Sequence, residues 1–206
     1  MDPVGVLDIE MGNLRSLCNA IDSLGVDPIV VREPSALFEV SRVLIPGVGS
    51  YRAAMGNLTR LGFVDPLRRF AASGRPVLGI CLGMQILSTR GEEGGAIPGL
   101  ALIPGDVVLM DSEPTLRLPH VGWNSVTFRA PHPVLRTIRD GKDFYFVHSY
   151  EFRCAPDHSY AETSYGRPFS SIVGVGNVLG VQFHPEKSQR NGLQLLENFC
   201  RWDGGC

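Results

Sequence analysis

A single cysteine lies between two glycines at the end of an apolar run, in the stretch RPVLGICLGMQIL (Arg75–Leu87). The segment Gly79-Ile80-Cys81-Leu82-Gly83 has the form of a nucleophile on a sharp strand-to-helix turn, where flanking glycines avoid clashes as the chain reverses. Such a turn would lift the Cys81 thiol clear of the sheet and direct the backbone N–H of Leu82 toward an oxyanion. Taken alone, the segment is explained equally well by a buried core cysteine, because free cysteines are often buried.

A nucleophilic cysteine needs a general base and a group that orients the base. The segment GVQFHPEKS contains candidates for both, because residues two apart in an extended chain point to one side and His184 can therefore meet Glu186. The alternative is a surface His-Pro turn with a solvated glutamate, and His132 in APHPVL is typical of such a turn. His184 differs from it because it ends the apolar run Val178–Phe183, and open α/β sheets bind ligands at the carboxyl ends of their strands.

A second glycine-rich loop, Pro46-Gly47-Val48-Gly49, follows another apolar run. Glycines there allow a backbone N–H to approach a substrate oxygen, so Val48 and Gly49 could complete an oxyanion hole with Leu82. By itself this loop is a weak indication, since any tight turn could use the same residues.

The hydrophobic pattern predicts the elements that must position these groups. β-branched runs alternate with helical periodicity in the first half of the chain, which indicates a parallel sheet wrapped by helices. The predicted strands are residues 4–9, 28–32, 42–47 and 76–80, and the predicted helices are residues 12–25, 51–61 and 63–72. After residue 87, short strands broken by glycine and proline, one of them over residues 143–152, suggest an antiparallel extension, followed by a closing helix over residues 189–202. We therefore expect an α/β fold with a flavodoxin-like open, mostly parallel sheet, helices on both faces, and one domain over residues 1–206.

Composition excludes several classes of function. The chain of 206 residues is 44% hydrophobic and 19% charged, with a formal net charge of −2, which gives no electrostatic reason to expect nucleic acid or an anionic membrane. The five cysteines are scattered without a CxxC pair, so neither a disulfide framework nor a metal site is expected; they are Cys18, Cys81, Cys154, Cys200 and Cys206. We find no signal peptide and no apolar stretch long enough to span a bilayer, and expect a cytoplasmic protein without a metal or organic cofactor.

Five motifs together resemble those of a known family. GICLGMQ, GVQFHPEKS and the PGVG loop are similar to class I, triad-type glutamine amidotransferases. The segments LRLPHVGWNSV (Leu116–Val126) and FYFVHSYEF (Phe144–Phe152) narrow the resemblance to the glutaminase subunits of imidazole glycerol phosphate synthases, and it extends over almost the whole chain.

The resemblance implies a role for each matching residue. Cys81 would attack the side-chain carboxamide of glutamine to give a thioester and ammonia. His184 would take and return the proton, and Glu186 would hold the imidazole tautomer. The backbone amides of Val48, Gly49 and Leu82 would form the oxyanion hole.

Further residues would bind the substrate in this family. Gln85 would help to hold the glutamine, and Glu93 would contact its α-amino group. His148, Ser149 and Tyr150 would line the α-carboxylate side, largely through backbone groups.

The family also implies a partner, because this chain has no phosphate-binding barrel. Ammonia would pass through a separate (β/α)₈ cyclase subunit to form imidazole glycerol phosphate and aminoimidazole carboxamide ribonucleotide in histidine biosynthesis. Asn13, Trp123 and Asn124 would then be interface candidates, although ordinary core packing explains Trp123 nearly as well.

The chain departs from the family at Ile9-Glu10, where a tyrosine-glycine pair is usual. Glu10 could alter the docking surface or mark a paralogue that feeds another synthase, such as one in surface-sugar biosynthesis. A non-catalytic scaffold and a cysteine peptidase-like hydrolase are further alternatives. The complete triad disfavours the scaffold, while the His-Pro-Glu pairing disfavours the peptidase.

Overall fold

A parallel sheet forms the centre of the protein. The structure is a computed structural model that describes residues 3–111 and 117–205. The parallel strands, in spatial order, are β2 (Pro28–Val31), β1 (Val4–Leu7), β3 (Arg42–Gly47), β4 (Val77–Cys81) and β13 (Val178–Val181). All residues of β1, β3, β4 and β13 are buried. Because both faces of the sheet are covered, these strands are almost continuously apolar in sequence.

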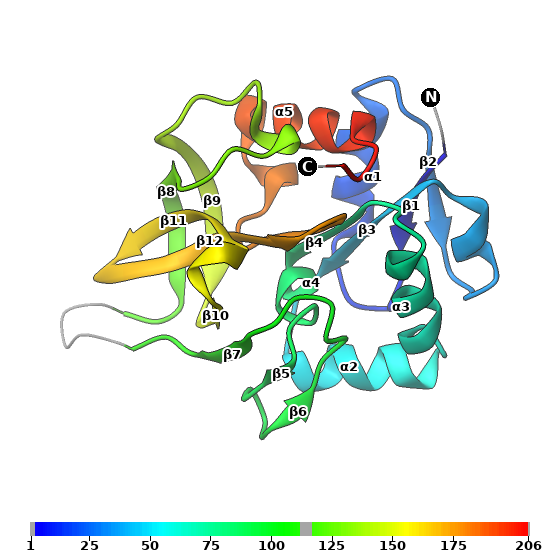
Figure 1. Ribbon diagram of the computed structural model, residues 1–206, viewed down its shortest axis with the longest axis horizontal. Coiled ribbons are helices and arrows are strands. Elements are labelled where there is room, and N and C mark those ends of the chain that lie inside the picture. Colours follow the sequence, from blue (N-terminus) through cyan, green and yellow to red (C-terminus); the bar gives the residue numbers. More distant parts are fainter. Residues whose placement is uncertain (1–2, 112–116, 206) are drawn as a thin grey trace.

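Helices cover both faces of this sheet (Figure 1). One face carries α1 (Leu14–Asp22) and α5 (Gln189–Arg201), and the other carries α2 (Tyr51–Arg60) and α3 (Val64–Ala72). The first core includes Leu17 of α1 and Phe199 of α5, whereas the second includes Leu58 of α2 and Phe70 of α3. The expected doubly covered, mostly parallel open sheet is therefore confirmed.

Beyond β13 the sheet continues mainly through antiparallel pairs, although β5 (Arg90–Gly91) runs parallel to β7 (Asp106–Leu109). The path continues through β12 (Arg167–Val175), β10 (Tyr150–Arg153), β7, β5 and β6 (Ile97–Pro98). Outside this path, β11 (Ser159–Tyr165) pairs with β12 and with β8 (His120–Phe128), which pairs with β9 (Lys142–His148). Short 3₁₀ turns lie at η1 (Ala36–Glu39), η2 (Pro133–Leu135), η3 (Pro156–His158) and η4 (Pro185–Lys187).

Two boundaries differ from the sequence prediction for an identifiable reason. Residues 143–152, expected as one strand, are divided at Ser149, because β9 pairs with β8 whereas β10 pairs with β7 and β12. The helix expected after Cys81 is only one turn, α4 (Leu82–Gln85), because the carbonyls of Ile86 and Leu87 accept hydrogen bonds from residues 100, 102 and 103 instead of extending the helix.

The Ile9-Glu10 departure is accommodated locally. Ile9 is buried, while exposed Glu10 takes a positive φ of 60°, a conformation in which glycine is favoured. Its backbone N–H donates to Asp8 Oδ1 at 3.0 Å, and its carboxylate forms an ion pair with Arg60 of α2. Glu10 therefore occupies a turn conformation that glycine favours and adds a charged pair to the surface.

Candidate active site

Cys81 occupies a strained turn between β4 and α4. Its backbone angles are φ 54° and ψ −110°, which non-glycine residues rarely adopt and which persist only where the surroundings hold them. A Cβ atom on Gly83 would lie 1.7 Å from the carbonyl oxygen of Ile45, and one on Gly79 would lie 2.5 Å from that of Gly83. Neither position leaves room for a side chain, so glycine at both positions allows the backbone on either side of Cys81 to pack this closely.

His184 and Glu186 form a buried pair. His184 Nδ1 lies 2.8 Å from Glu186 Oε1, and the two side chains are only 3% and 6% exposed. The backbone N–H of His184 donates to the carbonyl of Tyr145 at 2.9 Å, which ties the end of this segment to β9. The alternative of a solvated glutamate on a surface turn is therefore wrong. His132, which the sequence placed in such a turn, caps η2 but is buried.

The electrostatics favour a protonated His184. Burial acts to lower its pKa, but the interactions with Cys81 and Glu186 outweigh burial and raise the pKa to about 9. Its Nε2 atom is buried and meets hydrogen-bond geometry with no atom of the described residues, although the Cys81 sulfur is close enough to act on its charge. This nitrogen is thus available to exchange a proton with a group between it and the thiol.

Cys81 and His184 open into one cavity of about 360 Å³. The predicted oxyanion and substrate residues line the same cavity, together with Pro119 and Val147, and they are Val48, Gly49, Leu82, Gln85, Glu93, His148, Ser149 and Tyr150. These residues come from four separate parts of the chain. The structure therefore brings together every residue that the sequence assigned to the oxyanion hole and the substrate pocket.

Glu93 is held against the start of α2. Its Oε2 accepts the backbone N–H of Tyr51 at 2.7 Å, directly after the Pro46–Gly49 loop. A carboxylate at a helix N-terminus is favoured by the helix dipole and by the unpaired first-turn N–H groups. The contact fixes one oxygen of this carboxylate beside the cavity that Glu93 lines.

Two residues at the site were not identified from the sequence. Gln182 is fully buried, donates through Nε2 to Cys81 Sγ at 3.7 Å, and accepts at Oε1 from Gln85 Nε2 at 3.2 Å. Ser188 Oγ donates to the carbonyl of His184 at 2.6 Å and accepts from the N–H of Tyr145 at 3.0 Å. The two-residue spacing of Gln182 and His184 could have identified the first, whereas nothing in the sequence distinguishes Ser188 from other serines.

The three interface candidates lie in different surroundings. Asn13 is exposed and caps α1, because its Oδ1 accepts the N–H of Ser16 at 3.2 Å. Trp123 is 48% exposed, so the core-packing alternative is wrong, and its ring contacts Tyr145 edge-on. Asn124 is half-buried and donates to the carbonyl of Ser164 at 2.9 Å.

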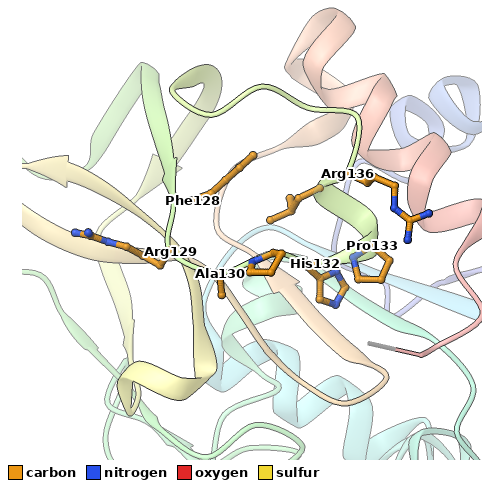
Figure 2. Close-up of a pocket in the computed structure, with 8 residues that line it drawn as sticks. Phe128, Arg129, Ala130, His132, Pro133 and Arg136 are labelled. Carbon is orange, nitrogen blue, oxygen red and sulfur yellow. The ribbon is translucent and has the colours of Figure 1, made fainter.

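Other features of the molecule do not compete with this cavity. A larger hollow of about 580 Å³ lies beside η2 (Figure 2), and it is lined by Phe128, Arg129, Ala130, Pro131, His132, Pro133, Leu135 and Arg136. It contains neither a cysteine nor a carboxylate–histidine pair. Burial raises the pKa of the remaining described thiols, Cys18, Cys154 and Cys200, which disfavours their reactive thiolate forms, while Cys206 lies outside the described residues.

Within residues 3–111 and 117–205, no three histidine, cysteine or acidic side chains are grouped so that they could hold a metal ion. Over the same residues, no helix has the length and apolarity needed to cross a bilayer.

A Gly192→Ala substitution is expected to damage both the fold and the site. Gly192 of α5 packs on the turn that carries the buried pair, and its Cβ would lie 1.8 Å from the carbonyl oxygen of Pro185. We expect this substitution to lower the unfolding free energy by about 2 kcal/mol. This is the opposite of the usual effect, because alanine normally stabilises a helix interior relative to glycine. Gly56→Ala in α2, where nothing lies within 4 Å, is the matched control. Urea unfolding that ranks the two variants equally would contradict this close packing.

Stability is expected to be greatest near pH 7. Burial lowers the pKa of His120 and His132 to about 4 and that of His148 to about 3. As the pH falls below 6.5, these histidines bind protons in the unfolded chain but not in the folded protein, and the folded protein loses stability. The raised pKa of His184 acts oppositely, because its contribution is complete below pH 6.5 and is lost as the pH rises through about 9. Each group changes the unfolding free energy by up to about 1.4 kcal/mol per pH unit. Urea unfolding at pH 5, 7 and 9 checks this expectation, and a monotonic trend would contradict it.

Comparison with known proteins identifies the family. The glutamine amidotransferase class-I family matches residues 5–202. An imidazole glycerol phosphate synthase subunit HisH from Moorella thermoacetica is 44% identical over 200 residues, covering 97% of this chain and 94% of that protein. The HisH 1 subunit from Prochlorococcus marinus is 48% identical over 204 residues and covers 94% of each chain.

A solved structure of a glutamine amidotransferase superposes on this chain with a TM-score of 0.74, and the match covers 96% of this chain and 98% of that structure's chain. The two sequences are 22% identical, so this likeness supports the fold alone. The chain therefore belongs to the class-I glutamine amidotransferases, and within them to the HisH family of enzyme subunits.

Proposed function

We propose that the chain hydrolyses glutamine with Cys81, His184 and Glu186 and supplies the ammonia to a separate cyclase barrel. The observation that carries this proposal is the shared cavity, in which a strained cysteine and a buried histidine, itself paired with Glu186, meet the predicted substrate residues. The relatives named HisH favour imidazole glycerol phosphate synthesis in the histidine pathway as the destination. Free thiols in the described chain are consistent with a reducing, cytoplasmic setting.

The first half-reaction forms a thioester. Cys81 Sγ attacks the carboxamide carbon of glutamine, and the N–H of Leu82, together with the Val48–Gly49 segment, stabilises the resulting oxyanion. His184 Nε2, which carries the proton taken from the Cys81 thiol, gives that proton to the leaving nitrogen, so that the C–N bond breaks and ammonia departs. Glu186 keeps the proton on Nδ1 and stabilises the imidazolium before the transfer.

The second half-reaction returns the enzyme to its starting state. His184, now neutral, removes a proton from water, and the hydroxide attacks the thioester carbonyl. The C–S bond breaks, the new γ-carboxylic acid passes its proton to solvent so that glutamate leaves, and the thiolate and imidazolium are restored. One water is consumed for each ammonia and glutamate formed, so no other reactant is needed.

The remaining lining groups explain the substrate choice. Glu93 presents a carboxylate to the α-ammonium group, and the strand break at Ser149 turns the backbone of residues 148–150 toward the α-carboxylate. Both hydrogens of Gln85 Nε2 are used, on the Tyr150 carbonyl and on Gln182, so that Oε1 is left to accept from the substrate carboxamide.

The test of this proposal is glutamine-dependent synthesis by the chain mixed with a HisH-associated cyclase barrel and the ribulosylamino-imidazole carboxamide nucleotide. We expect formation of imidazole glycerol phosphate with one glutamate released per product. Glutamine hydrolysis without conversion of this nucleotide would instead favour the paralogue that feeds another synthase. Absence of glutamine hydrolysis in any such complex would contradict the glutaminase function itself.

A further inference from the structure

Two buried imidazoles, of His120 and His148, face each other behind the cavity. They are partners in the β8–β9 register, and His120 Nδ1 lies 3.0 Å from His148 Nε2. His148 lines the cavity, whereas His120 does not. The reaction described above gives His120 no role, although the two rings are only 3% and 6% exposed.

The hydrogen bonds allow only one tautomer of each ring. His148 Nδ1 lies 2.8 Å from the carbonyl of Tyr150 and must donate to it, so its Nε2 is an acceptor. His120 Nδ1 must then donate to that acceptor, and His120 Nε2 accepts from Asn124 Nδ2 at 3.3 Å. An extra proton on either ring would place two N–H groups head to head. Burial favours the neutral forms that this arrangement requires, since it lowers the pKa of both rings.

Packing prevents His120 from leaving this arrangement. Its ring stacks on Tyr165 with a centroid distance of 4.2 Å and an interplanar angle of 27°. The His120 ring also stacks on Phe146, with a centroid distance of 5.0 Å. The donor at Nδ1 is therefore held in a fixed direction toward His148.

The chain of hydrogen bonds ends at the residues proposed to hold glutamine. The Tyr150 carbonyl accepts from His148 Nδ1 and also from Gln85 Nε2 at 3.2 Å. The second hydrogen of Gln85 Nε2 goes to Gln182 Oε1, so the position of the Tyr150 carbonyl decides where Gln85 Oε1 points. A shift of that carbonyl would misdirect the acceptor for the substrate carboxamide without touching the thiol.

We propose that His120 is a positioning residue for glutamine binding. Through His148 it holds the Tyr150 carbonyl, which in turn orients Gln85. The inference rests on the proposed glutaminase function, because it assigns a purpose to the same cavity. It predicts that loss of the His120 donor weakens glutamine recognition while the reactivity of Cys81 persists.

The test uses two electrophiles on the full chain, with the cyclase barrel present. A diazoketone analogue of glutamine must enter the cavity before it alkylates Cys81, whereas iodoacetamide needs only the thiol. His120→Phe keeps the ring stack and removes the donor, and His120→Asn keeps a donor near the Nδ1 position and removes the ring. We expect His120→Phe to raise the half-saturating analogue concentration about tenfold, because the buried acceptor His148 Nε2 is left unpaired. The rate of iodoacetamide labelling should change less than about twofold.

The asparagine variant separates hydrogen bonding from packing. We expect it to keep the half-saturating concentration within about threefold of wild type, because the donor to His148 is retained. If His120→Phe does not fold, His120→Gln replaces it, since its amide lies near the Nε2 position and cannot donate to His148; the same tenfold change is expected.

Three results would overturn the inference: wild-type behaviour of the phenylalanine variant, equal losses in both variants, or a parallel loss of iodoacetamide labelling. If wild-type Cys81 reacts with iodoacetamide but never with the analogue, the proposed function itself fails, and the inference fails with it.

Discussion

A Cys81→Ala variant is expected to lose glutamine-dependent synthesis and to keep synthesis driven by added ammonium salt. Removing the nucleophile of a covalent mechanism lowers turnover by about 10⁴-fold or more. The cyclase step is unaffected, because ammonia from solution can replace ammonia from glutamine. Rates measured with each nitrogen source on the complex with the barrel give the comparison.

Cys18→Ala is the matched control for this substitution. Cys18 is a half-buried thiol on α1 outside the cavity, so both activities should stay within about twofold of wild type. Loss of both activities in Cys81→Ala would indicate a damaged complex. Retention of both would contradict the role of Cys81 as nucleophile.

A Glu186→Gln variant is expected to lower glutamine turnover by about 10³-fold while preserving ammonium-driven synthesis. Glutamine is isosteric with glutamate but has no charge, so the imidazole loses both its electrostatic partner and its preferred tautomer. Because Glu186 helps to raise the pKa of His184 to about 9, the pKa should fall in the variant. NMR titration of the labelled His184 ring measures this change, and turnover is measured in parallel.

The control for the lost charge is Glu197→Gln. Glu197 pairs with Arg201 on the surface of α5, and exposed pairs of this kind contribute little. Turnover within about twofold of wild type is expected for it. An unchanged pKa of His184 in Glu186→Gln, together with undiminished turnover, would contradict the proposed orienting role.

The fold, and the candidate site residues Cys81 and His184 at the ends of strands, could be predicted from the sequence. Continuous apolar runs identify β1, β3, β4 and β13 because both of their faces are covered, and helical periodicity identifies α1, α2 and α3 because each buries one face. Cys81 and His184 could be found because each ends such a strand, and the carboxyl ends of parallel strands meet at one edge.

The remaining features depend on contacts between distant segments. The approach of Gly192 to Pro185 cannot be read from helical periodicity, which favours alanine there. The role of His120 depends on its register with His148 across β8 and β9, and the short α4 depends on hydrogen bonds from residues 100–103. Glu10 adopts a positive φ that sequence rules assign to glycine, because the turn is fixed by its own hydrogen bond and by the surrounding backbone.

The most direct test of the covalent mechanism is mass spectrometry of the chain, acid-quenched during glutamine turnover in complex with the barrel. We expect one γ-glutamyl group on the peptide that contains Cys81, absent in Cys81→Ala and lost when turnover continues after glutamine is removed. A γ-glutamyl group on another residue, or full glutamine hydrolysis by Cys81→Ala, would contradict it.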